Sequence, residues 1–315
     1  MPETAARSND LALLAATAQV EAVLAGSAKR PEIKAFFDEY TYTVSYVVYD
    51  PESRDAVIID SVLDYDPASG RTSQESAAMI VDFVKSENLK VIWLLETHAH
   101  ADHLSAAPWL QERTGGTIAI GEHIATVQET FGKLFNAGSD FARDGSDFGK
   151  LFADGEHFAI GGIDVTVLHV PGHTPACIAY VIGDAVFVGD TMFMPDYGSA
   201  RADFPGGDAR KLFRSLRRIL ALPEATRLFM CHDYLSENRS EYTWETTVEA
   251  QRRDNIHAHD GIGEDEFVAM RETRDKTLAM PRLILPSVQV NMRAGHFPPA
   301  EDNGITYLKI PVDAV

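Results

Sequence analysis

One stretch of the chain concentrates metal-binding side chains. It reads Glu-Thr-His-Ala-His-Ala-Asp-His at residues 96–103 and follows an apolar, strand-like run at residues 91–95. Imidazole binds zinc, iron, copper and nickel, and a carboxylate extends the choice to harder metals. The small residues Ala99 and Ala101 allow a tight turn, so the ligands can converge. Since three of the 11 histidines fall within this stretch, it predicts a metal site rather than a histidine-rich surface loop.

The composition limits the partners that such a protein can have. The 28 Lys and Arg against 47 Asp and Glu give a net charge of −19, which repels phosphate backbones and anionic lipid. We therefore expect no nucleic-acid partner and no membrane partner. Residues 1–7 lack the pattern of a signal peptide, and only two cysteines, Cys177 and Cys231, occur. These features predict a cytoplasmic protein whose two thiols are reduced and buried.

Local patterns alternate between strands and helices. Strands are expected at residues 40–49, 56–60, 91–95, 117–120, 163–170, 177–182, 185–188 and 227–231, and helices at 8–27, 74–87, 105–113, 208–221, 243–258 and 264–273. Residues 64–72 are expected to form a loop, residues 121–154 a lid or insertion whose phenylalanines cover something, and the segment from Pro281 an irregular tail. This order predicts an α/β sandwich of two mixed sheets covered by helices.

Three further loops carry ligand-type residues directly after predicted strands. His173 lies between Pro171 and Pro175, Asp190 follows Gly189, and His232 follows the strand at 227–231. Alone, each is more often a turn or capping residue. Together with residues 96–103, and in this order, they predict one composite metal site along an edge of the sheets.

This framework resembles that of the metallo-β-lactamase superfamily. The matching residues are Thr-His-Ala-His-Ala-Asp-His at 97–103, Pro-Gly-His-Thr at 171–174, Gly-Asp at 189–190, and His232. The resemblance covers roughly residues 35–300 and implies an αβ/βα four-layer sandwich, two mixed β-sheets flanked by helices. We therefore expect an N-terminal helical extension at residues 1–34 and a catalytic domain at residues 35–315.

Finer features are similar to the persulfide dioxygenases of that superfamily. They are Arg-Ala-Asp-Phe at 201–204, His-Asp-Tyr at 232–234, Val-Asn-Met-Arg at 290–293, and the stretch 60–70, which is similar to bacterial members. Some of those members are encoded with or fused to rhodanese-like domains, and we detect no such domain here. The resemblance implies oxidation of glutathione persulfide, or a similar small thiol persulfide, by O2 to sulfite and glutathione.

The resemblance also implies a ligand set. One Fe(II) per chain would be held by His98, His173 and Asp190, which leaves open coordination positions for the persulfide and for O2. Four further residues would surround this site and orient its ligands through hydrogen bonds. These are His100, Asp102, His103 and His232.

Other residues are candidates for catalysis or substrate binding. Asp102, His103 and Tyr234 are candidates for catalysis, although a structural role for Tyr234 is equally open. Arg201 and Tyr197 are candidates for substrate binding. For Arg201, an ion pair with Asp203 that stiffens the loop is the preferred interpretation.

The sequence also leaves other functions open for the same set of residues. The same residues would satisfy a binuclear Zn(II) thioesterase of the glyoxalase II type (a hydroxyacylglutathione hydrolase), which uses a metal-bound hydroxide. The short spacing between His173 and Asp190 leaves little room for the loop that such enzymes carry. A β-lactamase role is disfavoured by the absence of a periplasmic signal, and a non-catalytic binding protein by the complete ligand set. We also expect a homodimer.

Overall fold

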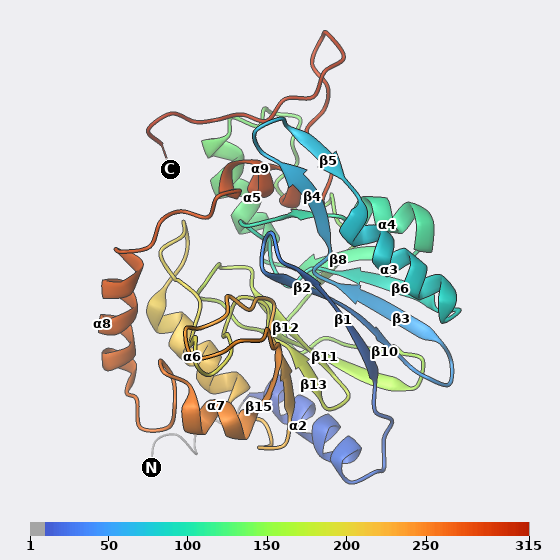
Figure 1. Cartoon of the computed structure of the whole chain (residues 1–315), viewed down its shortest axis with the longest axis vertical. Helices are drawn as coiled ribbons and strands as arrows, with labels where there is room; N and C mark the ends of the chain where they lie inside the picture. Colours follow the sequence, from blue (N-terminus) through green and yellow to red (C-terminus); the bar gives the residue numbers. More distant parts are fainter. Residues whose placement is uncertain (1–9, 315) are drawn as a thin grey trace.

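The computed structural model describes residues 10–314 and contains two six-stranded mixed β-sheets packed face to face (Figure 1). The first sheet has the order β1 (Glu32–Asp38), β2 (Thr43–Tyr49), β3 (Asp55–Ile59), β6 (Lys90–Leu95), β8 (Thr117–Gly121) and β9 (Lys150–Phe152). Its first three strands are antiparallel, and the last four run parallel.

The second sheet has the order β10 (His157–Ile160), β11 (Ile163–His169), β12 (Ile178–Ile182), β13 (Ala185–Phe187), β14 (Arg227–Phe229) and β15 (Glu245–Thr247). Only the β13–β14 pair is parallel. The expected hairpin at Gly183 and Asp184 joins β12 to β13, and Gly183 adopts a positive φ of 57° there.

Helices cover the outer face of each sheet and complete four layers. On the first sheet they are α3 (Glu75–Ser86), α4 (Ala107–Thr114), α5 (Ile124–Leu134) and α9 (Ile284–Asn291). On the second they are α2 (Leu11–Leu24), α6 (Ala209–Ile219), α7 (Val248–Asp254) and α8 (Glu264–Asp275). This is the αβ/βα sandwich expected from the sequence, and that prediction is confirmed.

The apolar strands are buried on both faces because each sheet lies between two layers. In β3, Ile58 belongs to the core under the helices, whereas Val57 and Ile59 belong to the core between the sheets. Leu94 and Leu95 of β6 divide in the same way. Alternate residues of a strand point to opposite faces, so a strand between two layers reads as a continuous apolar run.

A small third sheet corrects one expectation. Residues 64–72 are not a loop, because β4 (Val62–Asp66) and β5 (Arg71–Ser73) form a hairpin that also pairs with β7 (Leu104–Ser105). The Asp66 carboxylate accepts hydrogen bonds from Ala68 N (3.0 Å) and Ser69 Oγ (2.6 Å) and closes the turn. The polar sequence of residues 64–72 hid the end of β4 and the exposed strand β5. β7 directly follows the 96–103 stretch and fixes its end by pairing with β4.

The segment 121–154 is also more regular than expected. It contains α5 and β9, and its phenylalanines Phe131, Phe135, Phe141 and Phe148 are buried in the core under α9. Gln128 joins the irregular part to this core, since its Nε2 donates to Met292 O (2.9 Å) and its Oε1 accepts from Gly145 N (2.8 Å). The segment is an integral part of the first layer rather than a loop-like lid.

The structure differs from the expected pattern in two further places. The tail beyond Pro281 is not wholly irregular, because it contains α9, and the expected helix at 243–258 begins with β15 before α7. Residues 8 and 9 of the expected first helix lie outside the described residues. α2 packs on the second sheet through Ala16 and Val20, and the division near residue 34 stays a prediction.

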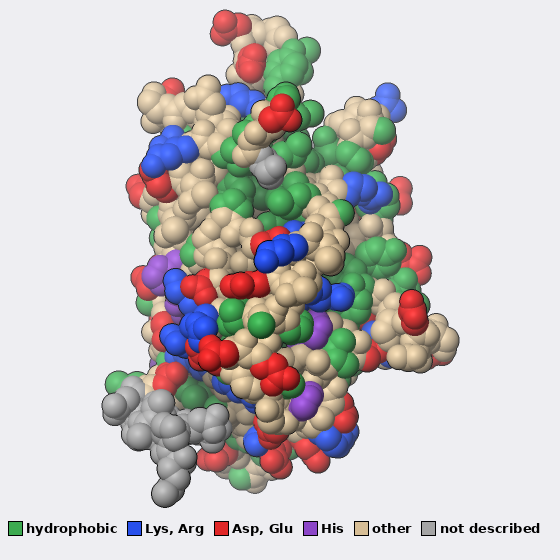
Figure 2. Space-filling view, turned by 90° about the vertical axis from the view of Figure 1, so that its left-hand side faces the viewer, with side chains coloured by type: hydrophobic (Ala, Val, Ile, Leu, Met, Phe, Trp, Pro, Cys, Tyr) green, Lys and Arg blue, Asp and Glu red, His purple; other side chains and the backbone are tan. Residues whose placement is uncertain are grey.

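Ion pairs connect the helices on one outer face. Arg210 of α6 lies 2.6 Å from Glu264 of α8, and Arg214 lies 3.0 Å from the same carboxylate. Acidic and basic side chains are intermixed over the face that carries α8 (Figure 2). Between residues 10 and 314, no helix is both long and apolar enough to cross a membrane.

Candidate metal centre

Four loops meet at one edge of the sandwich, each after a strand of a sheet. Residues 96–103 follow β6, His173 follows β11, Asp190 follows β13 and His232 follows β14. The Val44 N–Cys231 O hydrogen bond (2.7 Å) joins the edge of β2 to the His232 loop. The two sheets therefore bring together residues that lie far apart in the sequence.

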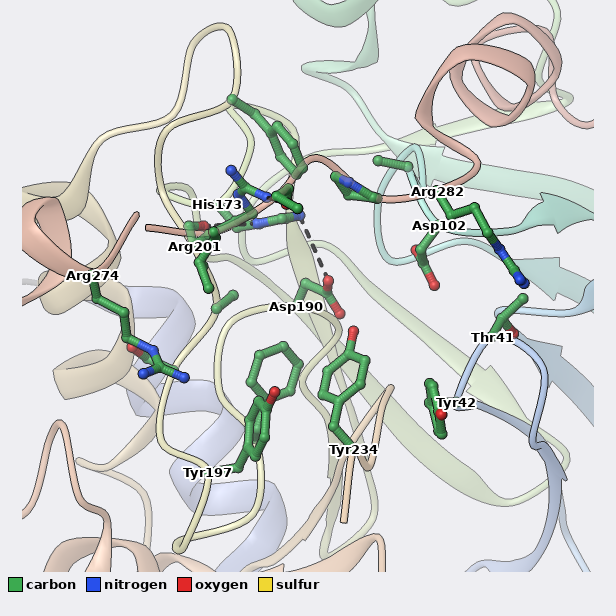
Figure 3. A pocket seen from close by; sticks show the side chains of 18 of the residues that line it. Thr41, Tyr42, Asp102, His173, Asp190, Tyr197, Arg201, Tyr234, Arg274 and Arg282 are labelled. Atoms are coloured by element: carbon green, nitrogen blue, oxygen red, sulfur yellow. Dashed lines mark hydrogen bonds and ion pairs between the residues drawn. The ribbon is translucent and has the colours of Figure 1, made fainter. Parts of the chain in front are cut away.

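His98, His173 and Asp190 form one group of metal-binding side chains. All three are buried, and one donor atom from each lies within 4.8 Å of the others. The Asp190 Oδ2 atom is 3.6 Å from His173 Nε2 and 4.0 Å from His98 Nε2 (Figure 3). The structure thus brings together the three residues that the sequence analysis selected as the ligands of one metal.

Several buried atoms at this edge have no hydrogen-bond partner among the described residues. They are His98 Nε2, His100 Nδ1, His103 Nε2, His232 Nε2 and Asp190 Oδ1. A buried polar atom without a partner costs roughly 1–3 kcal/mol, so such a cluster is unfavourable by itself. These nitrogens and oxygens are ligands for a transition metal, and the donor set therefore fits a metal ion.

The opposite ring nitrogens of the imidazoles are held by hydrogen bonds. His173 Nδ1 is 2.8 Å from Arg201 O, His98 Nδ1 is 3.0 Å from Thr97 Oγ1, and His100 Nε2 is 3.0 Å from Asp60 Oδ1. Such contacts fix the orientation of a metal-binding imidazole. The donor atoms are therefore positioned by the protein itself.

Asp60, at the end of β3, organises the base of the site. Its carboxylate accepts hydrogen bonds from Thr97 N and Thr97 Oγ1, both at 2.8 Å, and contacts His100. Burial opposes ionisation of Asp60, but His100 and these donors outweigh burial and lower its pKa. Asp60 was not selected from the sequence, although a carboxylate directly after an apolar strand is the pattern that also marks Asp190.

The other motif residues lie on the far side of Asp190. His232 Nε2 is 3.3 Å from Asp190 Oδ1 and 3.4 Å from Asp102 Oδ2. The Thr43 hydroxyl, which the sequence analysis missed, lies 3.4 Å from side-chain atoms of Asp102, His103 and His232. Atoms that could hold a second metal are therefore also present.

A cavity of about 410 Å³ opens beside the metal-binding group. Tyr197, Arg201 and Tyr234, which were selected from the sequence, all line it (Figure 3). The Arg201 guanidinium is already engaged, because it donates to both oxygens of Asp203 (2.6 and 2.8 Å) and to Ala279 O (2.7 Å). This geometry matches the ion-pair interpretation of Arg201.

Tyr234 lines the cavity beside Asp190 of the metal-binding group. Its ring stacks on His232 at a centroid distance of 5.4 Å, and its hydroxyl points toward Asp190 (Figure 3). Burial, followed by the carboxylates of Asp190 and Asp102, raises the pKa of Tyr234 well above its ordinary value. The phenol therefore stays protonated and can donate a hydrogen bond.

Both cysteines are buried free thiols, as expected. Burial raises the pKa of Cys177 to about 12, which disfavours the reactive thiolate. Cys231 Sγ lies 3.6 Å from Asp60 Oδ2, directly beneath the site.

Asn291, at the end of α9, holds the 96–103 loop from outside. In the sequence, residues 290–293 stand out only as part of a resemblance. Because Asn291 is 191 residues from His100, no local pattern in the sequence reveals the contact.

Comparisons with known proteins also indicate a metal-dependent enzyme. The family model described as the Metallo-beta-lactamase superfamily matches residues 40–232. A "Probable metallo-hydrolase" of Burkholderia pseudomallei is 56% identical over 293 residues, covering 90% of this chain and 99% of that protein. "Glyoxylase B2" of Dictyostelium discoideum is 46% identical and covers 90% of this chain and 98% of its own length.

Persulfide dioxygenases are more distant relatives. The mitochondrial persulfide dioxygenase ETHE1 of Bos taurus is 28% identical, over 86% of this chain and 91% of that protein. The crystal structure of ETHE1 from Myxococcus xanthus matches with a TM-score of 0.67 and 29% identity. That match covers 84% of this chain and 100% of the Myxococcus chain.

Proposed function

The chain belongs to the metallo-β-lactamase superfamily, and on this premise we propose that it is a metal-dependent enzyme acting on the sulfur of a glutathione derivative. The reaction proposed first is the oxidation of glutathione persulfide. In that reaction the persulfide, O2 and water yield sulfite and glutathione. The homodimer and the cytoplasmic location expected from the sequence stay predictions.

One observation carries this proposal. His98, His173 and Asp190 form a group of two imidazoles and one carboxylate beside an open cavity. Two histidines and one carboxylate on one face of the metal, with open positions opposite, are typical of non-haem Fe(II) oxygenases. The match to ETHE1 over the whole Myxococcus chain supports the same reaction.

The protein's own residues would prepare this chemistry. The backbone carbonyl of Arg201 and the hydroxyl of Thr97 keep His173 and His98 turned toward Asp190. Phe193 and Phe204 line the cavity and limit the access of water to the reacting sulfur. A bound Fe(II) supplies the redox chemistry that joins oxygen to sulfur.

Polar groups at the cavity would carry out the proton transfers of the reaction. The protonated phenol of Tyr234 points toward Asp190 and can donate a hydrogen bond to an anionic sulfur. Asp102 lines the same cavity and contacts His232 at 3.4 Å. The Asp102–His232 pair can therefore hold the proton that the departing thiolate needs.

A second candidate, hydrolysis of a glutathione thioester, has specific support. The names of the relatives at 46% and 56% identity favour a hydrolase over a dioxygenase. In addition, His232 Nε2 lies 3.4 Å from Asp102 Oδ2 and 3.3 Å from Asp190 Oδ1, and donor atoms of His100, Asp102 and His103 form another group that could hold a metal. Two Zn(II) ions bound side by side would generate a hydroxide nucleophile from water at neutral pH.

One set of assays distinguishes persulfide oxidation from thioester hydrolysis. The metal-free protein is reloaded with Fe(II) or with Zn(II), and each form is given glutathione persulfide in air and S-lactoylglutathione without oxygen. The proposal expects sulfite formation by the iron form, with little hydrolysis by either form. Thioester hydrolysis by the zinc form without any persulfide oxidation would establish the second candidate instead.

A further inference from the structure

Two arginines at the mouth of the metal-site cavity have no acidic partner among residues 10–314. Arg274 lies in the last turn of α8, and Arg282 follows Pro281 on the way to α9. Both line the cavity. In Figure 3 they lie on opposite sides of the labelled residues, with Asp190 between them.

The two other arginines that line the cavity both form ion pairs with aspartates, unlike Arg274 and Arg282. Arg201 is bound to Asp203. The buried Arg271 lies 2.7 Å from Asp275 and donates to Ser199 O (3.0 Å). Among the described carboxylates, none forms an ion pair with Arg274 or Arg282.

Arg282 is nevertheless held in place. Its guanidinium lies over the Tyr40 ring at 3.9 Å from the centroid, and its Nη2 is 3.4 Å from Tyr40 O. A stacked guanidinium keeps its outer edge free for a planar anion. Arg274 has no hydrogen-bond acceptor for its guanidinium among the described residues.

The charge around the cavity indicates what these groups bind. On a chain with a net charge of −19, acidic side chains are abundant, yet none in the described part of the chain pairs with these two guanidiniums. Arginine binds a carboxylate through two parallel hydrogen bonds. Two such groups on opposite sides of a cavity suit a ligand with a carboxylate at each end and its reacting centre between them.

We propose that Arg274 and Arg282 each bind one of the two terminal carboxylates of a glutathione-type peptide and so determine the substrate specificity. This arrangement would hold the cysteinyl sulfur over His173 and Asp190. The inference rests on the proposed function, because the metal-binding group is taken as the reacting centre. Thiol compounds with one carboxylate, or with none, lose one or both contacts.

Binding of an unreactive ligand tests this inference independently of the reaction. S-methylglutathione is titrated into the metal-loaded wild-type protein, Arg274→Gln and Arg282→Gln, and the dissociation constants are measured by calorimetry. Each substitution is expected to weaken binding about tenfold, which corresponds to about 1.4 kcal/mol. Lys276→Gln is the matched control, because it removes the same charge from an exposed residue outside the cavity lining.

A second ligand identifies which carboxylate each arginine binds. S-methylglutathione with its glycyl carboxylate esterified should bind the wild-type protein about tenfold more weakly. The variant that has lost the arginine facing that carboxylate should bind the ester and the parent compound equally. The other variant should still discriminate between the two compounds.

The outcomes separate this inference from the proposed function. If both arginine variants bind S-methylglutathione like the wild type and Lys276→Gln, the inference is wrong, even if the enzyme oxidises persulfide. The same conclusion follows if the wild type does not bind the ligand. If binding depends on both arginines but neither persulfide nor thioester is converted, the inference stands and the proposed function fails.

Discussion

Asn291 donates a hydrogen bond of 2.7 Å from its Nδ2 to the backbone carbonyl of His103, 188 residues earlier in the chain. The same nitrogen donates to His100 O (2.9 Å), and Oδ1 accepts from Ser105 N (2.8 Å). One buried side chain on α9 thus satisfies three backbone groups of the metal-binding loop. The C-terminal part of the chain therefore takes part in forming the metal site.

Replacing Asn291 by Leu should weaken both the fold and metal binding. The substitution keeps the volume but leaves two buried carbonyls and one N–H without partners, at roughly 1–3 kcal/mol each. We expect the free energy of unfolding of the metal-free protein to fall by about 3 kcal/mol, measured by urea denaturation. Metal affinity should fall about 10- to 100-fold, as for other residues that orient metal ligands.

Asn303→Ala is the control for Asn291, because Asn303 is exposed and its side chain contacts the nearby Tyr307 and Ile305 rather than the metal-binding loop. It should leave metal affinity unchanged. Unaltered metal affinity in a folded Asn291→Leu protein would show that the loop keeps its geometry without this contact.

Gly172 sets the position of His173. Its φ is 142°, and an added Cβ would overlap the backbone of Leu212 in α6. Gly172→Ala should therefore displace the loop, lower the free energy of unfolding by about 3 kcal/mol and reduce the metal content. Gly138→Ala is the control, since Gly138 also has a positive φ but no atom lies within 4 Å of an added Cβ. Similar losses for the two variants would contradict the steric argument.

Asp50 contributes a pH-dependent part of the stability. Burial would raise its pKa, but hydrogen bonds from Gly162 N and Glu52 N and the contact with Lys29 lower it from 3.8 to about 2. The ionised carboxylate therefore stabilises the fold above pH 3.8, and this stabilisation is lost as the pH falls toward about 2.

The test is the difference in unfolding free energy between the wild type and Asp50→Asn. This difference should be about 2 kcal/mol at pH 7. It should shrink as the pH is lowered from 3.8 toward about 2. A difference that stays constant down to the acid limit would mean that the charge of Asp50 is not responsible.

Metal stoichiometry distinguishes the direct ligands from their neighbours. His98→Ala removes a proposed ligand and should abolish stoichiometric metal binding, measured by elemental analysis of the purified protein. His103→Ala removes a residue outside the group of His98, His173 and Asp190 and should leave one metal per chain. Two metals in the wild type and one in His103→Ala would support the binuclear hydrolase instead.

The sequence predicts the periodic parts of the fold well. α3 and α6 lie close to their expected positions, because each has an apolar face. α8 also lies close to its expected position, although its buried residues are Phe267, Arg271 and Asp275. β1 was missed since its residues are only partly buried, and α9 was missed because Pro281 and Pro286 suggested irregular structure. Pro286 lies in the first turn of α9, where proline costs the helix no hydrogen bond.

The same distinction holds at the site. The ligand candidates could be found because His98, His173 and Asp190 fall in compact motifs after strands. Thr43 and Asn291 could not, because their contacts join distant segments. Arg274 and Arg282 could not, because only the fold brings them to the same cavity as the ligands. A single polar residue at the start of a strand, on a short helix or between two helices carries no periodic signal.

The most direct test of the central claim is the simultaneous measurement of dissolved oxygen and sulfite. The iron-loaded protein is given glutathione persulfide in a closed, air-saturated cell, and the uncatalysed reaction is subtracted. The proposal predicts that one O2 is consumed for each sulfite formed, and that His98→Ala shows neither change. Release of thiol without any consumption of oxygen would contradict it.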